Sequence, residues 1–364
     1  MLRVISTFIV SILILTPPTS LSGCASNNVT GVAPTEMSTP VTNTMPPVSY
    51  APSFEQPIDY VTIKGIKYST SLISLQLNAA GLNDEDITPL QYMANLTTLA
   101  LDLNQISDLS PLAYLTNLTV LYLGNNEISD IAPLTSLVNL TSLDLTRNQI
   151  EDLSPLAGLT NLTGLFLGQN KLNDITPLAD LTSLAWLELG DNKISDISPL
   201  ARLARMTKLG LNFTHISDIS PLAGLTNLEE LYLSDNQISD AKPLTGLTSM
   251  TRMDLGGNIV SNISPLADLM SLTSLNLSFN QVTDITPLTG LVYLTHLHLD
   301  NNQISDLLPL SGFSNLTFLG LSNNQVSDLL PLSGLTNLST LVLNDNPIND
   351  WSPVAHVKYL SGNK

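Results

Sequence analysis

One pattern, repeated along most of the chain, limits the possible folds more than any other feature of the sequence. From residue 99 onward the pattern L-x-L-x-x-N-x-I-S-D-I-S-P-L-x-x-L-T-x-L recurs every 22 residues without an insertion, and one earlier copy begins at Leu75. The first leucine position of the later copies is occupied by Leu99, Leu121, Leu143, Leu165, Leu187, Leu209, Leu231, Met253, Leu275, Leu297, Leu319 and Leu341. A period held this strictly predicts a solenoid, in which each unit stacks on the next with the same geometry.

Each conserved place in the repeat has a structural explanation. The L-x-L segment predicts a short parallel strand whose leucines point inward while the residues between them face outward on the concave side. The Asn that follows five residues after the first leucine, as in Asn104, is expected to turn inward and to bond loop backbone groups and the Asn of the next unit. Ala80 and Thr214 interrupt this Asn series. Ala80 lies in the first, capping unit, whereas Thr214 lies mid-array, where we expect a local irregularity.

The second half of the repeat, S-D-I-S-P-L, is expected to cross the convex side. Proline occurs in all thirteen copies, from Pro89 to Pro353, and it prevents a long helix there. Twelve copies carry Asp three residues before that proline, from Asp86 to Asp350, and Asn262 is the exception. Such a side chain accepts a backbone N–H at the start of a short 3₁₀ turn. Many of the 31 Asp and Glu residues therefore have a structural explanation that needs no calcium array.

These repeats resemble the leucine-rich repeat family, in its 22-residue bacterial internalin-like form, over residues 72–360. The resemblance implies an α/β-type leucine-rich repeat solenoid, a curved right-handed coil. Its concave face would carry a parallel sheet of about 13 short strands, and its convex face 3₁₀ or extended turns. It also implies that the concave face engages partner proteins. The best-known internalins begin with a helical cap and continue into an immunoglobulin-like domain, and this chain departs from them at both ends.

Both ends of the solenoid need a cover. Residues 58–72 alternate apolar and polar side chains about a possible Lys64-Gly65 turn, which predicts a strand or hairpin as the N-terminal cap. Residues 73–364 are expected to form the leucine-rich repeat domain with a short C-terminal cap. In the last unit Trp351 replaces the usual Ile, and Tyr359 begins another turn.

The N-terminus predicts a lipoprotein signal peptide over residues 1–23. Its apolar run, residues 4–15, is shorter than the roughly 18 residues that a membrane-spanning helix needs, and it follows a short positive start. Residues 21–24, LSGC, resemble the lipobox of bacterial lipoproteins, in which the cysteine sulfur receives a diacylglycerol. The resemblance implies lipidation of Cys24 and an anchor in the cell membrane or outer membrane, outside the cytoplasm. The alternative is an ordinary secretory cut near Ala25.

Residues 24–57 are rich in Ser, Thr, Asn and Pro and lack apolar periodicity, which predicts a disordered tether. Cys24 is the only cysteine in the chain. Once its sulfur carries lipid, the folded domain has no thiol for a disulfide or for catalysis.

Charge and histidine content narrow the function classes. A formal net charge of −18 repels phosphate backbones, so we expect no nucleic acid partner. His296, His298 and Asp300 share one strand face at a spacing that zinc could use, but the face is open to water and no second shell is evident. We therefore expect no metal, no cofactor and no enzymatic activity, and we expect a monomer.

Function in such a scaffold is expected where the repeat varies, because the invariant positions are used for packing. The candidate protein-binding residues, all at outward-facing strand positions, are Tyr122, Asp144, Phe166, Trp186, Glu188, Lys208, Glu230, Tyr232, Arg252 and Asp254. Aromatic and Arg side chains dominate interface energies, so this set predicts a patch for an unidentified protein ligand. Small residues, Gly164, Gly168, Gly190 and Gly210, are expected to leave the rings exposed.

Two alternatives remain open for this patch. In the first, the patch binds no partner: the aromatic side chains only cover neighbouring strands, and Lys208, Glu230 and Arg252 only pair with one another. A different functional class is an envelope scaffold or glycan-binding module, in which the rings stack on sugars. The preferred hypothesis is a lipid-anchored protein that binds another protein through its concave face, in adhesion or recognition.

Overall fold

The computed structural model describes residues 58–362, which belong to one compact unit, Gln56–Lys364. The expected signal peptide, the tether and Cys24 lie outside the described residues. Within them, no helix is long and apolar enough to cross a membrane.

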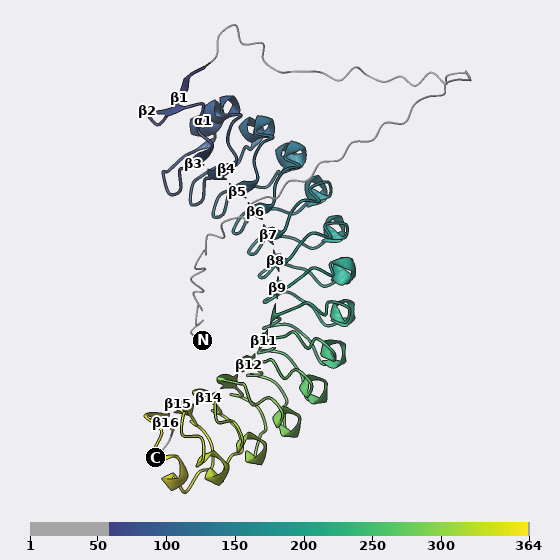
Figure 1. Ribbon diagram of the computed structural model, residues 1–364, viewed down its shortest axis with the longest axis vertical. Helices are drawn as coiled ribbons and strands as arrows, with labels where there is room; N and C mark the ends of the chain where they lie inside the picture. Colours follow the sequence, from purple (N-terminus) through teal and green to yellow (C-terminus); the bar gives the residue numbers. More distant parts are fainter. Residues whose placement is uncertain (1–57, 363–364) are drawn as a thin grey trace, which may run out of the picture. The chain divides into compact units, whose positions relative to one another are not determined.

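The described unit is a solenoid built around one parallel sheet of 14 strands, in which each strand pairs with the next along the chain. Figure 1 shows the strands following the inner side of a curved array, with the 3₁₀ turns on the outer side. The strands are β3 Ser74–Gln76, β4 Thr98–Ala100, β5 Val120–Tyr122, β6 Ser142–Asp144, β7 Gly164–Phe166, β8 Trp186–Glu188, β9 Lys208–Gly210, β10 Glu230–Tyr232, β11 Arg252–Asp254, β12 Ser274–Asn276, β13 His296–His298, β14 Phe318–Gly320, β15 Thr340–Val342 and β16 Tyr359–Ser361. The leucine-rich repeat solenoid is confirmed, and β16 is the strand beyond the expected 13.

Leucine packing holds each unit to the next. The middle residue of each three-residue strand points inward, and Leu99 and Leu101 of the second unit are both 0% exposed. Leu121 and Leu123 repeat this arrangement one unit later. Full burial of a leucine contributes about 1.5–3 kcal/mol relative to exposure, so the inward column supplies a large part of the stability.

The Asn series forms a buried ladder, although its bonds differ from those expected. Asn126 Nδ2 donates to the carbonyl oxygens of Leu101 and Leu123, each at 3.0 Å, and its Oδ1 accepts the N–H of Ile106 at 3.1 Å. The expected contact with the Asn of the next unit is wrong, because the amide is already saturated by backbone groups of two units. One side chain therefore joins consecutive turns through the main chain.

Thr214 is the irregularity in this ladder. Its hydroxyl lies 2.9 Å from the Leu211 carbonyl oxygen and 2.7 Å from Asn236 Oδ1, and a single proton serves one of them at a time. In the other units the Asn Oδ1 accepts a backbone N–H from the preceding turn, as Asn192 accepts that of Leu172. Thr214 does not reach so far, so among the described residues the N–H of Ile194 has no hydrogen bond.

Short 3₁₀ helices cover the convex side. They are η1 Thr88–Tyr92, η2 Ser110–Tyr114, η3 Ala132–Ser136, η4 Ser154–Leu156, η5 Thr176–Leu178, η6 Ser198–Arg202, η7 Ser220–Leu222, η8 Lys242–Leu244, η9 Ser264–Leu266, η10 Thr286–Leu288, η11 Leu308–Leu310, η12 Leu330–Leu332 and η13 Ser352–Val354. Asp108 Oδ1 accepts the N–H of Ser110 at 2.8 Å, as expected from the sequence. Asn262 makes the same contact at 3.0 Å, so a carboxamide also serves there.

The first unit departs from this rule because it begins with an α-helix, α1 Asp84–Ile87. Asn83 and Asp86 form a capping box at its N-terminus, so Asp86 does not start a 3₁₀ turn as expected. Asp84 instead accepts the N–H groups of Ser107 and Asp108 in the next unit, at 2.7 and 2.9 Å. Burial opposes ionisation of Asp84, but the bonds from Ser107 and Asp108 outweigh it and lower its pKa.

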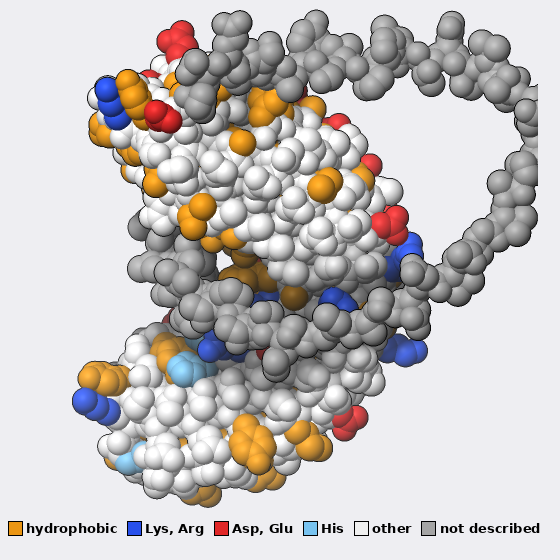
Figure 2. Space-filling model, turned by 45° about the horizontal axis from the view of Figure 1, so that its top comes forward, with side chains coloured by type: hydrophobic (Ala, Val, Ile, Leu, Met, Phe, Trp, Pro, Cys, Tyr) orange, Lys and Arg blue, Asp and Glu red, His pale blue; other side chains and the backbone are white. Residues whose placement is uncertain are grey.

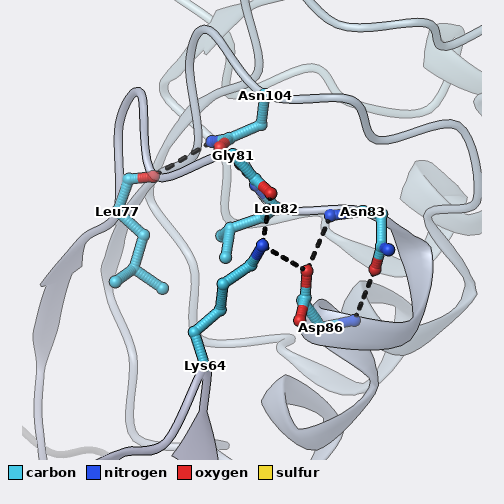
Figure 3. Close-up of polar contacts among 7 residues, drawn as sticks. All are labelled: Lys64, Leu77, Gly81, Leu82, Asn83, Asp86 and Asn104. Atoms are coloured by element: carbon cyan, nitrogen blue, oxygen red, sulfur yellow. Dashed lines mark hydrogen bonds and ion pairs between the residues drawn. The ribbon is translucent and has the colours of Figure 1, made fainter.

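An antiparallel hairpin of β1 Tyr60–Ile63 and β2 Ile66–Ser69 precedes the first unit, with its turn at Lys64 and Gly65. Lys64 reaches from this turn into the first unit (Figure 3), where its Nζ donates to the Gly81 carbonyl oxygen at 2.6 Å and lies 3.3 Å from Asp86 Oδ2. Val61 and Ile63 are buried against the first unit. The hairpin therefore covers the exposed end of the leucine column.

Trp351 packs on the core near the other end of the array. Its ring lies against Gly362, where an added Cβ would be 2.3 Å from the ring. This large side chain takes part in covering the last leucines, together with β16.

Candidate functional site on the concave face

The structure places all ten candidate residues on the outward face of consecutive strands, β5 to β11. One row pairs Tyr122, Asp144, Phe166, Glu188, Gly210, Tyr232 and Asp254 in register across the sheet. The second row pairs Trp186, Lys208, Glu230 and Arg252. Neighbouring strands in a sheet lie about 4.8 Å apart, so the two rows form one continuous surface.

An aromatic pair and a lysine form the centre of this surface. The Phe166 and Trp186 rings meet edge to face, with centroids 4.7 Å apart and an angle of 76°. Lys208 Nζ lies 5.1 Å from the Trp186 ring centroid, within the range of a cation–π contact. Trp186 is 36% exposed, so the cluster has an apolar surface available to a partner.

Glu230 on β10 lies between the basic residues of the two neighbouring strands. Its Oε1 lies 3.1 Å from Lys208 Nζ and 4.0 Å from Arg252 Nη1, and its Oε2 accepts the Tyr232 hydroxyl at 2.9 Å. Burial, followed by the bond to Glu230 and its charge, raises the Tyr232 pKa to about 12. The alternative interpretation that these charges pair with one another is thus partly met, although Arg252 remains exposed.

Glu188 occupies a space that only a glycine neighbour leaves free. A Cβ added to Gly210 would lie 2.0 Å from Glu188 Oε2, so the carboxyl group fills the place of a side chain on β9. Burial raises the Glu188 pKa to about 7, despite a bond from the Gly190 backbone. A partner that approaches this face at neutral pH therefore meets a carboxyl group close to its titration midpoint.

Tyr122 and Asp144 form a separate, acidic part of the face with Asp102. Asp102 Oδ1 and Asp144 Oδ1 converge on Gly124, 3.2 and 3.5 Å from the position of an added Cβ. Burial raises the pKa of both acids, and the neighbouring Asp144 charge raises that of Asp102 further. Burial and these two charges also raise the Tyr122 pKa. Asp102 escaped the sequence prediction because it lies two residues beyond Ala100, the last outward position of β4.

Asp254 lies at the other end of the first row. Its Oδ1 accepts the N–H of Gly256 and the side-chain amide of Asn276, each at 2.9 Å. Burial, and to a lesser extent the charge of Asp235, raises its pKa. Asp254 is thus held by its own turn rather than joined to the aromatic centre.

The glycines do not leave the rings as exposed as expected. Phe166 folds back on Gly164, whose added Cβ would lie 3.5 Å from the ring, and the ring is half-buried. Tyr122 and Tyr232 are also half-buried. The space over Gly210 holds the Glu188 carboxyl group instead of an open ring. Figure 2 shows basic, histidine and hydrophobic side chains along the hollow side of the array.

The histidine face holds an aromatic stack. The centroid of the Phe318 ring lies 4.5 Å from that of the His298 ring and 6.2 Å from that of the His296 ring. The Asp300 carboxylate turns away to accept the Ser322 N–H at 2.9 Å. Within residues 58–362 no group of three His, Cys, Asp or Glu side chains is arranged for a metal ion. Burial lowers the His298 pKa, which favours the neutral ring on Phe318.

A family model described as leucine-rich repeats (2 copies) matches the chain. The matched segments are residues 94–136, 116–158, 138–180, 226–268, 271–312 and 314–356. These segments cover more than half of the sequence, and the chain belongs to the leucine-rich repeat family. Proteins of this family commonly bind protein ligands, and their fold is typically an interaction scaffold rather than an enzyme. A comparison with curated protein sequences gave no significant match.

Within that family the chain is similar to the internalins. It is 38% identical to an internalin (inlF) from Listeria monocytogenes, with a TM-score of 0.79 over 82% of this chain and 90% of that one. The functional domain of InlJ from the same organism, which includes a cysteine ladder, is 23% identical with a TM-score of 0.63, over 80% of this chain and 72% of that one. The ectodomain of the plant receptor kinase GASSHO1/SCHENGEN3 from Arabidopsis thaliana, in complex with CASPARIAN STRIP INTEGRITY FACTOR 2, is 21% identical with a TM-score of 0.57, over 84% of this chain and 49% of that one. The last two show the fold alone.

Proposed function

We propose that this chain is a lipid-anchored, extracytoplasmic bacterial protein that binds another protein through its concave face and has no catalytic activity. The observation that carries the proposal is the continuous series of contacts from Phe166 through Trp186, Lys208 and Glu230 to Arg252. Aromatic and Arg side chains at the centre of such a surface contribute most to protein binding. The similarity to the internalin from Listeria monocytogenes supports an adhesion or recognition role.

The glycan-binding alternative is less well supported by the same contacts. Sugars stack on an open aromatic face, whereas the Trp186 ring is flanked by the Phe166 ring and by Lys208. The half-buried Tyr122 and Tyr232 offer little more open ring surface. A protein–protein interface accommodates such contacts, because it can bury the edges of aromatic rings beside Lys or Arg side chains.

The test combines partner capture with a matched pair of variants. Cross-linking on intact cells, followed by pull-down, identifies the partner, and its affinity is then measured for Phe166→Ala/Trp186→Ala. We expect a loss of at least about tenfold. Tyr293→Ala is the control, because Tyr293 is a 61% exposed aromatic residue outside both concave rows. Unchanged affinity of the double variant would remove the aromatic centre from the binding site, and hits of similar strength on a glycan array would favour the alternative.

The anchor on Cys24 is tested separately, because binding does not depend on it. Mass spectrometry of the mature N-terminus is expected to show Cys24 as the first residue, with its sulfur diacylated. Cys24→Ser should release the protein from the membrane fraction with its partner affinity unchanged. An unmodified Cys24 would refute the anchor and leave the binding proposal standing.

A further inference from the structure

A column of left-handed residues follows the strands. The residue four places after the first strand leucine has a positive φ in every unit from β3 to β15. The column is Ala79, Leu103, Asn125, Arg147, Gln169, Asp191, Phe213, Asp235, Gly257, Phe279, Asn301, Asn323 and Asp345. Asn, Asp and Gly adopt this conformation most readily and fill just over half of the places. Any bulky apolar residue in the column therefore opposes the local backbone preference.

Phe213 and Phe279 are the aromatic residues in this column, with φ of 53° and 55°. They are 58% and 63% exposed, so burial in this chain does not offset the backbone cost. Non-glycine residues in such conformations cost about 1–3 kcal/mol and are found at ligand clamps. Two rings that neither relieve the backbone nor enter the core point to a role in contact with another molecule.

The two rings belong to one contiguous edge. From Ala79 to Asn323, a hydrogen bond connects each left-handed residue to the next turn: the N–H of Phe213 donates to the Ser234 carbonyl oxygen at 2.9 Å, and that of Asp235 to the Gly256 carbonyl oxygen at 2.8 Å. Three repeats separate Phe213 from Phe279, a distance of roughly 14 Å at the usual strand spacing. The 48% exposed Ile259 extends the apolar surface beside them, at a position that is polar, most often Gln, in nearly all other units.

A carboxylate lies between the rings. Gly257 has φ of 65°, and a Cβ added there would lie 2.7 Å from Asp235 Oδ1, so the Asp235 carboxylate leans over Gly257. Among the described residues Asp235 has no ion pair. The edge thus consists of the exposed Phe213 ring, the Asp235 carboxylate over Gly257, which has no ion pair among the described residues, and the exposed Phe279 ring.

We propose that this edge, which we call the Phe213–Phe279 edge, binds an extended protein segment that carries Lys or Arg midway between two apolar side chains. An extended chain advances about 3.3 Å per residue, so alternate side chains on one face at positions i, i+2 and i+4 span roughly 13 Å. That span matches the separation of the two rings, with the basic residue above Asp235. The segment has the form apolar-x-basic-x-apolar.

Charge favours such a partner over a second copy of the chain. The formal net charge of −18 makes two copies repel each other, whereas it attracts a basic segment. The edge lies beside the C-terminal half of the concave rows but shares no residue with them. The proposal therefore does not depend on the concave site.

The test pans a phage-displayed library of random dodecapeptides against the full chain. We expect the enriched peptides to share the form apolar-x-basic-x-apolar. Phe213→Asn/Phe279→Asn should weaken the selected peptide at least about tenfold, and Asp235→Asn should weaken it several-fold. Replacing the basic residue of the peptide by Glu should abolish binding to the unsubstituted protein.

Leu103→Asn is the matched control, because Leu103 is a 58% exposed residue at the same place in the column, with φ of 60°. It should leave peptide binding unchanged. Since Asn suits the left-handed backbone, the double variant should unfold at the same or a higher temperature, which separates loss of binding from loss of fold. A lower unfolding temperature, full binding by the double variant, or loss of binding in Phe166→Ala/Trp186→Ala alone would overturn the proposal. Self-association that the double variant abolishes would overturn it too, in favour of a second copy.

Discussion

The pKa values of carboxyl groups on the two faces of the solenoid are shifted in opposite directions. On the convex side the N–H and then the hydroxyl of Ser154 bond Asp152 and lower its pKa. Ser220 lowers the pKa of Asp218 in the same way. On the concave side burial raises the pKa of Asp144 and Glu188. The same chemical group therefore favours its charged form on one face and is penalised for it on the other.

This difference reflects two environments, because the convex acids are exposed and held by hydrogen-bond donors, whereas the concave acids are largely buried. A convex Asp satisfies a backbone N–H that otherwise lacks a partner at the start of a 3₁₀ helix. Burial removes water from the Glu188 carboxyl group on the concave side. Within the part of the chain that the structure describes, this group forms no hydrogen bond to the backbone of a neighbouring unit. In the proposed complex, a basic group of the partner would offset this loss of solvation.

The largest effect is expected from Glu188→Gln. Because the folded pKa of Glu188 is about 7, above its ordinary value of 4.5, the folded state binds the proton more tightly than the unfolded state. The protein should therefore gain roughly 2 kcal/mol of stability from this group as the pH falls from 8 to 5. Glu188→Gln should remove that gain. Denaturant unfolding of both proteins at pH 5 and pH 8 measures it, and equal pH dependence would show that the carboxyl group is well solvated.

A smaller effect is expected on the convex face. Asp108→Ala removes the acceptor for the Ser110 N–H and should cost about 1 kcal/mol of unfolding free energy. Asp108→Asn should be nearly neutral, because Asn262 already fills this place in another unit. Chemical denaturation at neutral pH compares the two variants. If both were equally destabilised, charge rather than the hydrogen bond would be the main contribution of the convex acids.

The smallest effect is expected from Lys208→Gln. Glu230 keeps the Tyr232 hydroxyl and the nearby Arg252, so loss of the lysine should cost less than about 1 kcal/mol. Added salt should reduce the difference further, because the pair is partly exposed. A thermal melt at low and high salt gives the measurement. A loss of several kcal/mol would mean that these charges belong with the residues that hold the fold.

The sequence predicted the parts of the fold that the period controls. The strand positions, the inward leucines and the convex Asp caps follow from one unit and recur in the others. The bonding of Asn126 was not predicted correctly, because the choice between a neighbouring amide and backbone groups depends on exact turn geometry. Asp86 also differs, since the first unit starts with a short α-helix instead of a 3₁₀ turn.

The outward positions of the candidate residues were predicted from the sequence, but their contacts were not. The outward positions of Trp186 and Lys208 follow from alternation along a strand, whereas the position of the Glu188 carboxyl group depends on the absence of a side chain at Gly210 one strand away. Phe213 and Phe279 were missed as a pair. Their left-handed backbone is a property of the turn, and neither residue type signals it.

Thr214 has a consequence for how the array comes apart. Stability in a solenoid is close to a sum of terms within units and between neighbours. The boundary between the units of Ile194 and Thr214 lacks the two hydrogen bonds that an Asn such as Asn192 makes to the preceding unit. Partial opening should therefore begin at this boundary and divide the array into two cooperative blocks, with the Ile194 amide among the first to exchange with deuterium. The concave contacts from Phe166 to Arg252 cross the same boundary. A protein bound there would hold the two blocks together, and its arrival would register as slower amide exchange far from the interface.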